Sequence, residues 1–463
     1  MNRLPDCRLP DCHLPDCHLP DWEGLRVVAA GGGVTGTSVV RALEPLGATV
    51  TVLDDRPGSA AALPAGVDLV VTSPGWRPDH PLLLGAAAAG VPVWGDVELA
   101  WRFALEGSVP WLVVTGTNGK TTTTELLAAV LTAAGRDALA CGNIGLPLLD
   151  AVLRVPVPEV LAVELSSFQL HWAPSVRPFA GAVLNLAPDH LDWHGGMAAY
   201  AAAKLRAYGD ADTLAVGVAG SDALLARAPG RRVLVTLDPP AAGQLGLVRQ
   251  MGGPALLVDR CFGPGAPDEA VALASLDELP WVRAPHDLTN ALAAAALARA
   301  YGVEAEAVAE GLGGFVPGAH RMSLVATVGG VRYVDDSKAT NPHAAVASLT
   351  AHDDVVWLAG GLNKGLGFDE LAIAAGAADV RAAVLLGACA DEIAGALARH
   401  APAIPVIRVA DLDAGVREAT RLAAGHGTVL LAPAAASMDM FRDYRERGEV
   451  FAAAVRRLEG GPA

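Results

Sequence analysis

The sequence is poor in positive charge and has no long apolar run. Its 34 Lys and Arg residues are outnumbered by 50 Asp and Glu residues, which gives a formal net charge of −16, and no long basic run is visible. A nucleic-acid groove needs clustered Lys and Arg, so binding of nucleic acid is disfavoured. No stretch of about 18 uninterrupted apolar residues exists, so a membrane span is not expected.

Cysteine is also scarce, with six residues in a chain of 463. This number excludes a disulfide scaffold, which packs many cysteines into a short secreted chain. The first residues are rich in proline and aspartate and lack the apolar middle of a secretory signal. We therefore expect a cytoplasmic protein with reduced thiols.

The N-terminus contains a five-residue repeat. Residues 3–21 read RLPDC-RLPDC-HLPDC-HLPD, which places Cys7, Cys12 and Cys17 near two histidines. Thiolate and imidazole are zinc ligands, so a metal-binding tail is one interpretation, but the closely spaced ligand pairs of zinc sites are missing. Proline at every fifth position also opposes regular structure. We predict that residues 1–24 are a disordered extension or a start-site artefact.

The rest of the chain is rich in apolar residues, which make up 52% of the sequence, many of them alanine. Alanine favours helices and is poor in strands, so a helix-rich α/β protein fits better than an all-β protein. From Leu25, short apolar strands alternate with helices in three series, which predicts three α/β domains. We expect them at residues 25–107, 108–317 and 318–463. The Pro- and Gly-rich segment 217–283 gives no clear assignment.

The first of these series opens with a glycine-rich turn. Gly31, Gly33 and Gly36 satisfy the pattern G-x-G-x-x-G between an apolar strand and a helix, and Asp54 follows near the place of a ribose-binding acid. Physically, the pattern means that backbone N–H groups at a helix N-terminus face a diphosphate. Taken alone it predicts a nicotinamide-dependent oxidoreductase, although a UDP-sugar is another diphosphate that fits.

The second series opens with WLVVTGTNGKTTT, a buried strand, a glycine loop and a helix. Gly116 and Gly119 allow the backbone to curl around phosphates, Lys120 meets the outer phosphates, and Thr121 can ligate Mg²⁺. The full Walker pattern has glycine where this chain has Val114, so the loop is a shortened variant. ATP is favoured over GTP because no N-K-x-D guanine signal is visible.

Polar residues follow two further apolar strands of this series. Glu164 ends the strand EVLAVE, where a phosphate-binding sheet commonly offers a carboxylate to magnesium. The next strand, AVLNL, leads to Asp189 and His190, with Asp192 and His194 close behind. A single histidine here is more often an ordinary hydrogen-bonded loop residue. An acid and a histidine at strand ends beside a phosphate loop nevertheless point to a metal-assisted phosphate site.

These motifs together resemble the Mur ligases of peptidoglycan synthesis, and GTNGKTT is shared across that superfamily. Within the family, four further segments resemble the members that add D-glutamate: ELSSFQL (164–170), DDSKATN (335–341), GGLNKG (360–365) and APAAASMDMFRDYRERGEVF (432–451). The resemblance runs from about Leu25 to the C-terminus. It implies a Rossmann-like N-terminal domain that binds the UDP-sugar, a P-loop central ATPase domain and a Rossmann-like C-terminal domain that binds the amino acid.

The resemblance also implies the binding residues, which we state as expectations. For ATP they are Gly116, Thr117, Asn118, Gly119, Lys120, Thr121, Thr122, Asn290, Arg321, Asp336 and Lys338. For the sugar nucleotide they are Gly33, Val34, Thr35, Gly36, Asp54, Asp55, Arg56, Ser73, Pro74, Gly75 and Asn143. For D-glutamate, whose carboxylates need cations and hydroxyls, they are Thr340, Lys364, Ser437 and Tyr444.

Two Mg²⁺ ions and a modified lysine are further implications of the resemblance. Thr121 would ligate the first ion, and Glu164 and His190 the second. Lys204, in AAKLRAY, matches the family lysine that is carbamylated by CO₂ and then braces the metal site. Lys120, His190 and Lys204 form the implied catalytic set. From the residues alone, Lys204 would be interpreted as a surface lysine on a helix.

The sequence departs from the family pattern at two places. Asp287, in APHDLTN, stands where the family has an asparagine, so a carboxylate near the adenine would alter the match of donors and acceptors, although Asn290 is kept. Tyr444 stands where phenylalanine is frequent, which is a mild change. Neither residue is expected to touch the transferred phosphoryl group.

The function that follows is an ATP-dependent ligase that activates a carboxylate as an acyl phosphate and joins it to an amino acid. The implied substrates are UDP-N-acetylmuramoyl-L-alanine and D-glutamate, and we expect a monomer. A family member that adds a diamino acid is the nearest alternative, since DHLDWHG is also typical of that enzyme. A nicotinamide-dependent oxidoreductase and a catalytically silent nucleotide-binding protein are alternatives of other classes.

Overall fold

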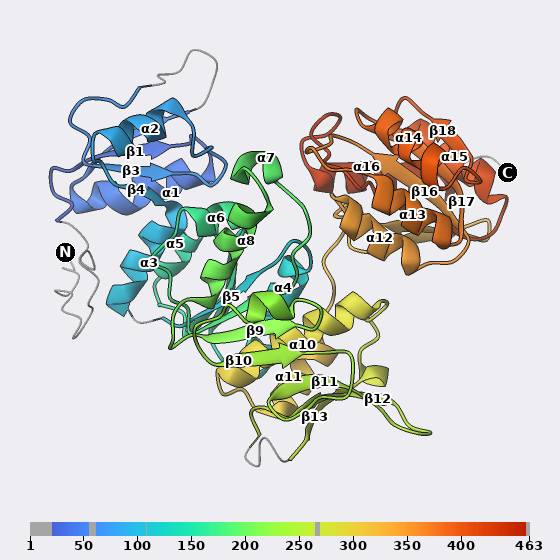
Figure 1. Ribbon diagram of the computed structural model, residues 1–463, viewed down its shortest axis with the longest axis horizontal. Helices are drawn as coiled ribbons and strands as arrows, with labels where there is room; N and C mark the ends of the chain where they lie inside the picture. Colours follow the sequence, from blue (N-terminus) through green and yellow to red (C-terminus); the bar gives the residue numbers. More distant parts are fainter. Residues whose placement is uncertain (1–20, 55–61, 108, 264–268, 460–463) are drawn as a thin grey trace. The chain divides into compact units, whose positions relative to one another are not determined.

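The computed structural model of the chain describes residues 21–54, 62–107, 109–263 and 269–459. These residues form two compact units, one of the described residues up to Leu186 with those of Met197–Phe315, and the other of Ala187–Gly196 with the described residues from Val316 onward. Each unit is an α/β structure in which parallel strands dominate, which confirms the predicted fold class (Figure 1). The repeat over residues 1–20 lies outside the described residues, as do Asp55 and Arg56.

The first sheet of the first unit has four parallel strands in the order β2-β1-β3-β4. Its elements are β1 (Arg26–Ala30), α1 (Val34–Leu43), β2 (Thr49–Leu53), β3 (Leu69–Thr72), α2 (Pro81–Ala88), β4 (Val93–Gly95) and α3 (Asp96–Gly107). Side chains alternate along a strand, so Val27 packs against α1 while Val28 packs against α2 on the opposite face. From β1 the chain crosses to β2 on one side, whereas from β3 it crosses to β4 on the other side. Open α/β sheets bind ligands at the point where the strand order reverses in this way.

The second sheet of the first unit has nine strands in the order β13-β12-β11-β10-β9-β8-β5-β7-β6 (Figure 1). The strands are β5 (Trp111–Thr115), β6 (Ala138–Gly142), β7 (Val160–Glu164), β8 (Ala180–Val183), β9 (Leu214–Val218), β10 (Arg232–Val235), β11 (Gln244–Arg249), β12 (Ala255–Asp259) and β13 (Val271–Ser275). Pairing is parallel from β6 to β11 and antiparallel from β11 to β13. The unassigned segment 217–283 thus supplies the strands of one sheet edge.

Helices cover both faces of this sheet. They are α4 (Lys120–Ala133), α5 (Leu148–Val152), α6 (Ser167–His171), α8 (Met197–Leu205), α9 (Asp222–Leu225), α10 (Pro285–Ala300) and α11 (Ala305–Gly313). Leu112 and Val114 of β5 pack in one core with α4, α10 and α11. Trp111 and Val113 face the other way, into a core that also contains Val27 of the first sheet. The two sheets of the first unit are therefore joined by a shared hydrophobic core.

The second unit contains a six-stranded sheet in the order β14-β15-β19-β16-β17-β18, in which only the β14–β15 pair is antiparallel. Its elements are β14 (Ser323–Val328), β15 (Val331–Asp335), α12 (Pro342–Thr350), β16 (Val355–Gly360), α13 (Asp369–Ala377), β17 (Val380–Leu386), α14 (Ala390–His400), β18 (Val406–Arg408), α15 (Leu412–Ala423), β19 (Thr428–Leu431) and α16 (Tyr444–Glu459), with the short α7 (Leu191–His194). Helices α12 to α14 cover one face of the sheet, and α15 and α16 cover the other. Among the described residues, no helix is both long and apolar enough to cross a membrane.

Candidate active site

The phosphate loop joins β5 to α4 in the first unit. Gly119 adopts a left-handed conformation (φ 85°), and a Cβ there would lie 2.5 Å from Oδ1 of Asn290, so only glycine fits. Thr121 and Thr122 are buried in the first turn of α4. The predicted residues from Gly116 to Thr122 thus lie together at the carboxyl end of a parallel strand, with Asn290 of α10 against them.

Asn185 fixes the shape of this loop, and sequence reasoning missed it. Its backbone oxygen accepts from the N–H of Thr117 (3.1 Å), and its side-chain Oδ1 accepts from the N–H of Asn118 (2.9 Å). Its Nδ2 donates back to the Asn118 oxygen (3.1 Å). The signal that could have found it is its place just after β8, the strand paired to β5, because parallel strands bring their carboxyl ends to one edge.

Two lysines share one acceptor beneath the loop. Nζ of Lys120 donates to the Gly116 oxygen (3.0 Å) and the Thr117 oxygen (2.8 Å), and Nζ of Lys204 donates to the same Gly116 oxygen (2.7 Å). Lys204 is 2% exposed and lies over the ring of Tyr200, at 4.7 Å from its centroid. The interpretation of Lys204 as a surface lysine was therefore wrong: α8 turns that side toward the phosphate loop.

Glu164 ends β7, next to β5, and is 1% exposed. Its Oε1 accepts from Nδ2 of Asn143 (2.7 Å), while its buried Oε2 has no hydrogen-bond partner. A buried carboxylate oxygen without a donor is costly, and a bound cation would relieve that cost. Among the described residues, no group of three His, Cys, Asp or Glu side chains could hold a metal ion alone. That suits Mg²⁺, which takes one or two carboxylates and completes its shell with substrate phosphates and water.

Asp287, the departure from the family pattern, caps its own helix. Its Oδ2 accepts from the backbone N–H groups of Arg283 (2.9 Å) and Ala284 (3.1 Å) before α10. Carboxylate side chains at a helix N-terminus are favourable, because they accept from its free N–H groups. The carboxylate of Asp287 is therefore hydrogen-bonded within its own chain. This reduces the mismatch with adenine that the sequence led us to expect.

Apart from Asn143, which follows β6 of the second sheet, the described residues that are predicted for the sugar nucleotide lie at the carboxyl edge of the first sheet. The turn that follows β1 runs from Gly31 to Gly33, and a Cβ at Gly36 would lie 2.2 Å from the Gly31 oxygen. Asp54 follows β2 and packs against Gly32, while Ser73 follows β3 and lies against Gly31. Pro74, Gly75 and the helix start at Val34 and Thr35 belong to the same edge.

His190 belongs to the second unit, with the short segment Ala187–Gly196. Its backbone is left-handed (φ 53°), and its Nε2 lies 3.5 Å from Oδ2 of Asp189. Nζ of Lys364 lies 3.9 Å from Oδ1 of the same Asp189. The structure thus brings the predicted metal-site histidine together with a lysine predicted for D-glutamate. Glu164, Lys204 and Thr121 belong to the first unit.

Three loops meet at the carboxyl ends of β15, β19 and β16 in the second unit. The N–H of Ala434 donates to the Ala339 oxygen (2.9 Å), next to Thr340. Leu362 and Ala436 exchange two backbone hydrogen bonds, which links the loop of Lys364 to that of Ser437. Backbone contacts therefore hold together the loops of all three residues.

Arg447 braces two of these loops from beneath and was also missed. It is 2% exposed, and its guanidinium donates to the Ser337 hydroxyl (3.0 Å), the Ser337 oxygen (2.9 Å) and the Ala435 oxygen (3.1 Å). Burial lowers the pKa of Arg447 to about 10, so it remains a cation at neutral pH. Nothing in the pattern RERGE distinguishes this buried arginine from its exposed neighbours.

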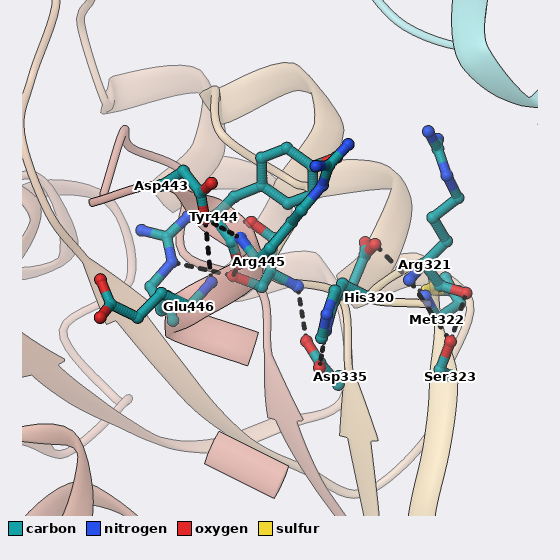
Figure 2. Close-up of polar contacts among 12 residues, drawn as sticks. His320, Arg321, Met322, Ser323, Asp335, Asp443, Tyr444, Arg445 and Glu446 are labelled. Atoms are coloured by element: carbon teal, nitrogen blue, oxygen red, sulfur yellow. Dashed lines mark hydrogen bonds and ion pairs between the residues drawn. The ribbon is translucent and has the colours of Figure 1, made fainter. Parts of the chain in front are cut away.

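Tyr444 lies among cations at the start of α16, shown in Figure 2 beside Arg445 and the segment from His320 to Ser323. Nζ of Lys338 lies 4.0 Å from the centroid of its ring, and Nε of Arg445 donates to its hydroxyl (3.3 Å). Burial alone would raise the pKa of Tyr444, but Lys338, Arg445 and Arg321 together lower it below its ordinary value. Tyr444, predicted for D-glutamate, thus lies beside Lys338 and Arg321, predicted for ATP.

Asp336 directly follows β15 and is fixed by two hydrogen bonds, close to Lys338. Its Oδ1 accepts from the N–H of Met322 (3.3 Å), and its Oδ2 accepts from the Ser348 hydroxyl. The neighbouring Asp335 accepts from Nδ1 of His320 (2.6 Å) and from the N–H of Ser337 (2.9 Å) (Figure 2). These bonds fix the loop that presents Lys338.

Known proteins match this arrangement over nearly the whole chain. Residues 114–224 match the Mur ligase middle domain, and residues 320–435 match the Mur ligase, glutamate ligase domain. A protein of Frankia casuarinae named UDP-N-acetylmuramoylalanine–D-glutamate ligase is 56% identical over 95% of both chains. One of Streptomyces avermitilis with the same name is 52% identical, over 94% of this chain and 99% of its own. The chain belongs to the UDP-N-acetylmuramoylalanine–D-glutamate ligase family.

Solved structures of other ligases share the fold. The MurF ligase of Thermotoga maritima in complex with ADP matches 94% of this chain and 96% of its own, at a TM-score of 0.59 and 17% identity. The UDP-N-acetylmuramate-alanine ligase MurC of the same organism matches 94% and 99%, at a TM-score of 0.56 and 19% identity. At this identity the comparison shows the fold alone. Function in this family rests on the close relatives and on the site.

Proposed function

We infer that the chain is an ATP-dependent ligase that joins D-glutamate to UDP-N-acetylmuramoyl-L-alanine in the synthesis of peptidoglycan precursors. The observation that carries this conclusion is the identity of 48–56%, over about 95% of the chain, to relatives that all bear the name of that ligase. Fold alone does not fix a reaction, so the site must supply the chemistry. A phosphate loop beside a buried, unpartnered carboxylate oxygen supports it.

ATP is proposed to bind with its phosphates in the loop from Gly116 to Thr122. Backbone N–H groups at the start of α4 would meet the phosphates, and Lys120 would leave its backbone acceptors to meet the outer phosphates. Asn290, Arg321, Asp336 and Lys338 are proposed as further contacts to the nucleotide. The complex of ADP with a MurF ligase of the same fold supports a nucleotide in this class of structure.

Two Mg²⁺ ions are proposed, the first held by Thr121 and the second by Glu164 with His190. The donor set fits a hard cation, because Glu164 offers a buried oxygen without a donor and Thr121 offers a hydroxyl at the loop. When bound, Mg²⁺ would offset the repulsion between the triphosphate and the attacking carboxylate. Asn143 would orient Glu164 by its bond to Oε1. His190, proposed as a second ligand, belongs to the other unit, and its role rests on the family resemblance.

Lys204 is proposed to carry a carbamate. Two ammonium groups on the Gly116 oxygen repel each other, and burial disfavours a charged lysine, so both effects favour the neutral amine at Lys204. The neutral amine attacks CO₂, forms an N–C bond and releases a proton. The product is a carbamate anion, which places a buried negative charge beside the ammonium group of Lys120.

The proposed reaction transfers the γ-phosphoryl group of ATP to the alanyl carboxylate, giving ADP and an acyl phosphate. Positioning and electrostatic stabilisation are the levers for such a transfer, and Lys120 supplies the positive charge at the transferred group. The amine of D-glutamate then attacks the acyl carbon, and the tetrahedral intermediate expels phosphate to leave the amide. The amine proton passes to His190 or to the Lys204 carbamate.

The other substrates are assigned from the grouping of residues in each unit. The turn from Gly31 to Thr35, with Gly36, Asp54 and the Ser73–Gly75 loop, is proposed to hold the uridine diphosphate. Thr340, Lys364, Ser437 and Tyr444 are proposed for D-glutamate, because a lysine and hydroxyls suit its carboxylates. A cytoplasmic monomer is proposed as the working form, which light scattering of the purified chain would test.

The deciding experiment measures phosphate release with UDP-N-acetylmuramoyl-L-alanine and ATP while the amino acid is varied among D-Glu, L-Glu, L-Lys and meso-diaminopimelate. D-Glu alone should support turnover. A response to L-Lys or meso-diaminopimelate instead would move the chain to a ligase that adds a diamino acid. Nicotinamide oxidation without phosphate release would indicate an oxidoreductase, and ATP binding without any product would indicate a silent binding protein.

A further inference from the structure

Helix α1, which begins at the first glycine turn, is held by two carboxylates from elsewhere in the first unit. Asp96 opens α3, and its Oδ2 accepts from the Thr35 hydroxyl (3.2 Å). Asp150 lies on α5, and its Oδ2 accepts from the Ser38 hydroxyl (3.1 Å) and from Nη2 of Arg41 (2.5 Å). The two carboxylates therefore contact α1 at its first, second and last turns.

These polar contacts add something that the apolar packing of α1 does not supply. Val39 and Leu43 are fully buried in the core shared with the first sheet, and they dock the helix. Apolar packing is non-directional. It therefore restricts the rotation of α1 about its axis, and its sliding along that axis, less strictly than hydrogen bonds do. Ser38 is 2% exposed, so its hydroxyl needs a partner inside the protein, and Asp150 is that partner.

Asp150 also connects α1 to the proposed metal carboxylate. Helix α5 follows the tight loop that begins at Asn143, and the N–H of Gly142 closes that loop on the Leu146 oxygen (3.1 Å). Asn143 in turn donates to Glu164 (2.7 Å). A short path of bonded groups therefore runs from the helix that opens at the first glycine turn to Glu164 at the second sheet.

We propose that Asp150 and Asp96 are positioning residues for the sugar nucleotide, which set helix α1 so that its first turn presents backbone N–H groups to the diphosphate. The proposal rests on the assignment of the first glycine turn to the sugar nucleotide. Neither carboxylate touches the substrate in this scheme: each acts through α1. Asp150 sets the distance between the diphosphate and the reacting carboxylate, and Asp96 sets the orientation of Thr35.

Asp96 predicts a pH dependence of substrate binding that ordinary packing would not produce. Burial raises its pKa to about 6, and the groups that lower it are the Thr35 hydroxyl and the N–H groups of Val97 and of Asp96 itself. Glu98 and Arg102, the charged residues next along α3, are paired with each other (2.9 Å). An ionised Asp96 beside the first turn of α1 would repel a diphosphate there, so binding should be tighter when Asp96 is protonated.

The first experiment compares Asp150→Ala with Asp68→Ala. Asp68 is the control, because its carboxylate also accepts a hydrogen bond, from the backbone N–H of Arg26 (2.8 Å), but at the amino ends of the strands of the same sheet. We expect Asp150→Ala to raise the KM for UDP-N-acetylmuramoyl-L-alanine about tenfold, since small misplacements of a bound substrate are costly, with the KM for ATP within about twofold of wild type. Asp68→Ala should change neither KM.

Arg41→Met is the second variant, for the case that Asp150→Ala folds poorly. It leaves the Ser38–Asp150 bond in place and removes only the exposed cation, so the KM for the sugar nucleotide should rise by about threefold, part of the Asp150→Ala effect. An equal rise in the KM values for ATP and for the sugar nucleotide, in either variant, would indicate a general loss of structure and overturn the proposal.

The second experiment measures the KM for UDP-N-acetylmuramoyl-L-alanine from about pH 5.5 to 8 in wild type and Asp96→Asn. The diphosphate of this substrate is a diester and keeps its charge over that range. In wild type the KM should rise severalfold as the pH passes through about 6, and in Asp96→Asn it should stay flat and low. A wild-type profile that persists in Asp96→Asn would refute the role of Asp96.

Failure of the proposal can be told apart from failure of the function. Direct calorimetric titration of the wild type with UDP-N-acetylmuramoyl-L-alanine settles whether the sugar nucleotide binds at all. No binding would remove the proposed function itself. Binding that is indifferent to Asp150→Ala, Arg41→Met and Asp96→Asn would leave the function standing and overturn the positioning role.

Discussion

The two glycine turns of the first unit share a backbone design and differ in the charges around it. Each follows a parallel strand, β1 or β5, and opens a helix, α1 or α4. Each therefore directs backbone N–H groups at the phosphates that it is proposed to hold. Beside the second turn lie Lys120 and Lys204, whereas beside the first lie Asp54 and Asp96.

The difference separates a turn that holds a phosphate from one that takes part in its transfer. A diphosphate that is bound but does not react needs only backbone donors and a helix N-terminus, so carboxylates can lie nearby. A triphosphate under attack by a carboxylate needs positive charge at the transferred group. The glycine pattern alone does not distinguish these tasks, which is why the first turn taken by itself predicted an oxidoreductase.

The distribution of lysine sharpens this comparison. Only four of the 34 basic residues are lysines: Lys120, Lys204, Lys338 and Lys364. All four belong to the proposed site, and every other cation is an arginine. Lysine differs from arginine in being a compact charge that can lose its proton. The chain thus keeps lysine where transfer chemistry is proposed and has none at the first glycine turn.

The largest expected effect comes from removing the cation of the second turn. Lys120→Ala should lower kcat by at least about 10² to 10³, the usual loss for one key electrostatic donor. Lys120→Arg should also be impaired, because a planar guanidinium does not replace a compact ammonium. Phosphate release measures both, with Arg136→Ala as a control, since Arg136 is an exposed cation of the same unit. Near-normal turnover of Lys120→Ala would remove the phosphate loop from the mechanism.

The next effect concerns the charge of Lys204. If this lysine is a carbamate, removal of CO₂ and bicarbonate should lower activity by at least about tenfold, as for loss of a group that orients a metal site, and bicarbonate should restore it. Carbon-13 NMR with labelled bicarbonate should show a carbamate signal that Lys204→Arg abolishes. Activity that is unchanged in CO₂-free buffer would show that both lysines of the second turn act as amines.

A smaller effect is expected from the side chain that shapes the second turn. Asn185→Ala removes the acceptor of the Asn118 N–H and leaves the backbone bond to Thr117. Losing one partner of a buried bond costs about 1–3 kcal/mol, so the KM for ATP should rise about tenfold while that for the sugar nucleotide changes little. The reverse pattern, with the sugar nucleotide affected first, would contradict the assignment of the two turns.

The helices and strands could be predicted from the sequence, and so could the clustering of the motifs in space. Both depend on local features, namely the periodicity of apolar residues in strands and the residue types of loops. The phosphate loop, Glu164 and the glycine turn lie where parallel strands end, and such ends meet at one edge of a sheet. Asn185 could also have been found this way, from its place just after β8. Arg447 could not, because it binds the hydroxyl and backbone oxygens of loops distant in sequence. The burial of Lys204 was missed for the same reason, since it depends on how α8 packs.

The segment 217–283 shows another limit of sequence reasoning. Its strands β10 to β13 are short, and Gly246 lies within one of them, β11. Propensity over such short runs is a weak guide, and only pairing with β9 assigns them to the sheet. Asp287 was likewise interpreted through the ligand that it faces in the family, whereas its bonds to Arg283 and Ala284 serve the helix.

The last prediction concerns stability rather than turnover and belongs to the first turn. The pKa of Asp96 is raised from 3.8 to about 6 in the folded protein, so the folded state binds this proton more tightly than the unfolded state does. Its contribution to stability is therefore full below about pH 4 and is lost as the pH rises toward 6. Asp96→Asn keeps an acceptor for Thr35 and cannot ionise, so it should be more stable than wild type at pH 7, by up to about 3 kcal/mol. The advantage should vanish near pH 4. Urea unfolding at both pH values measures it, and an equal difference at both would mean that the ionisation of Asp96 is not the cause.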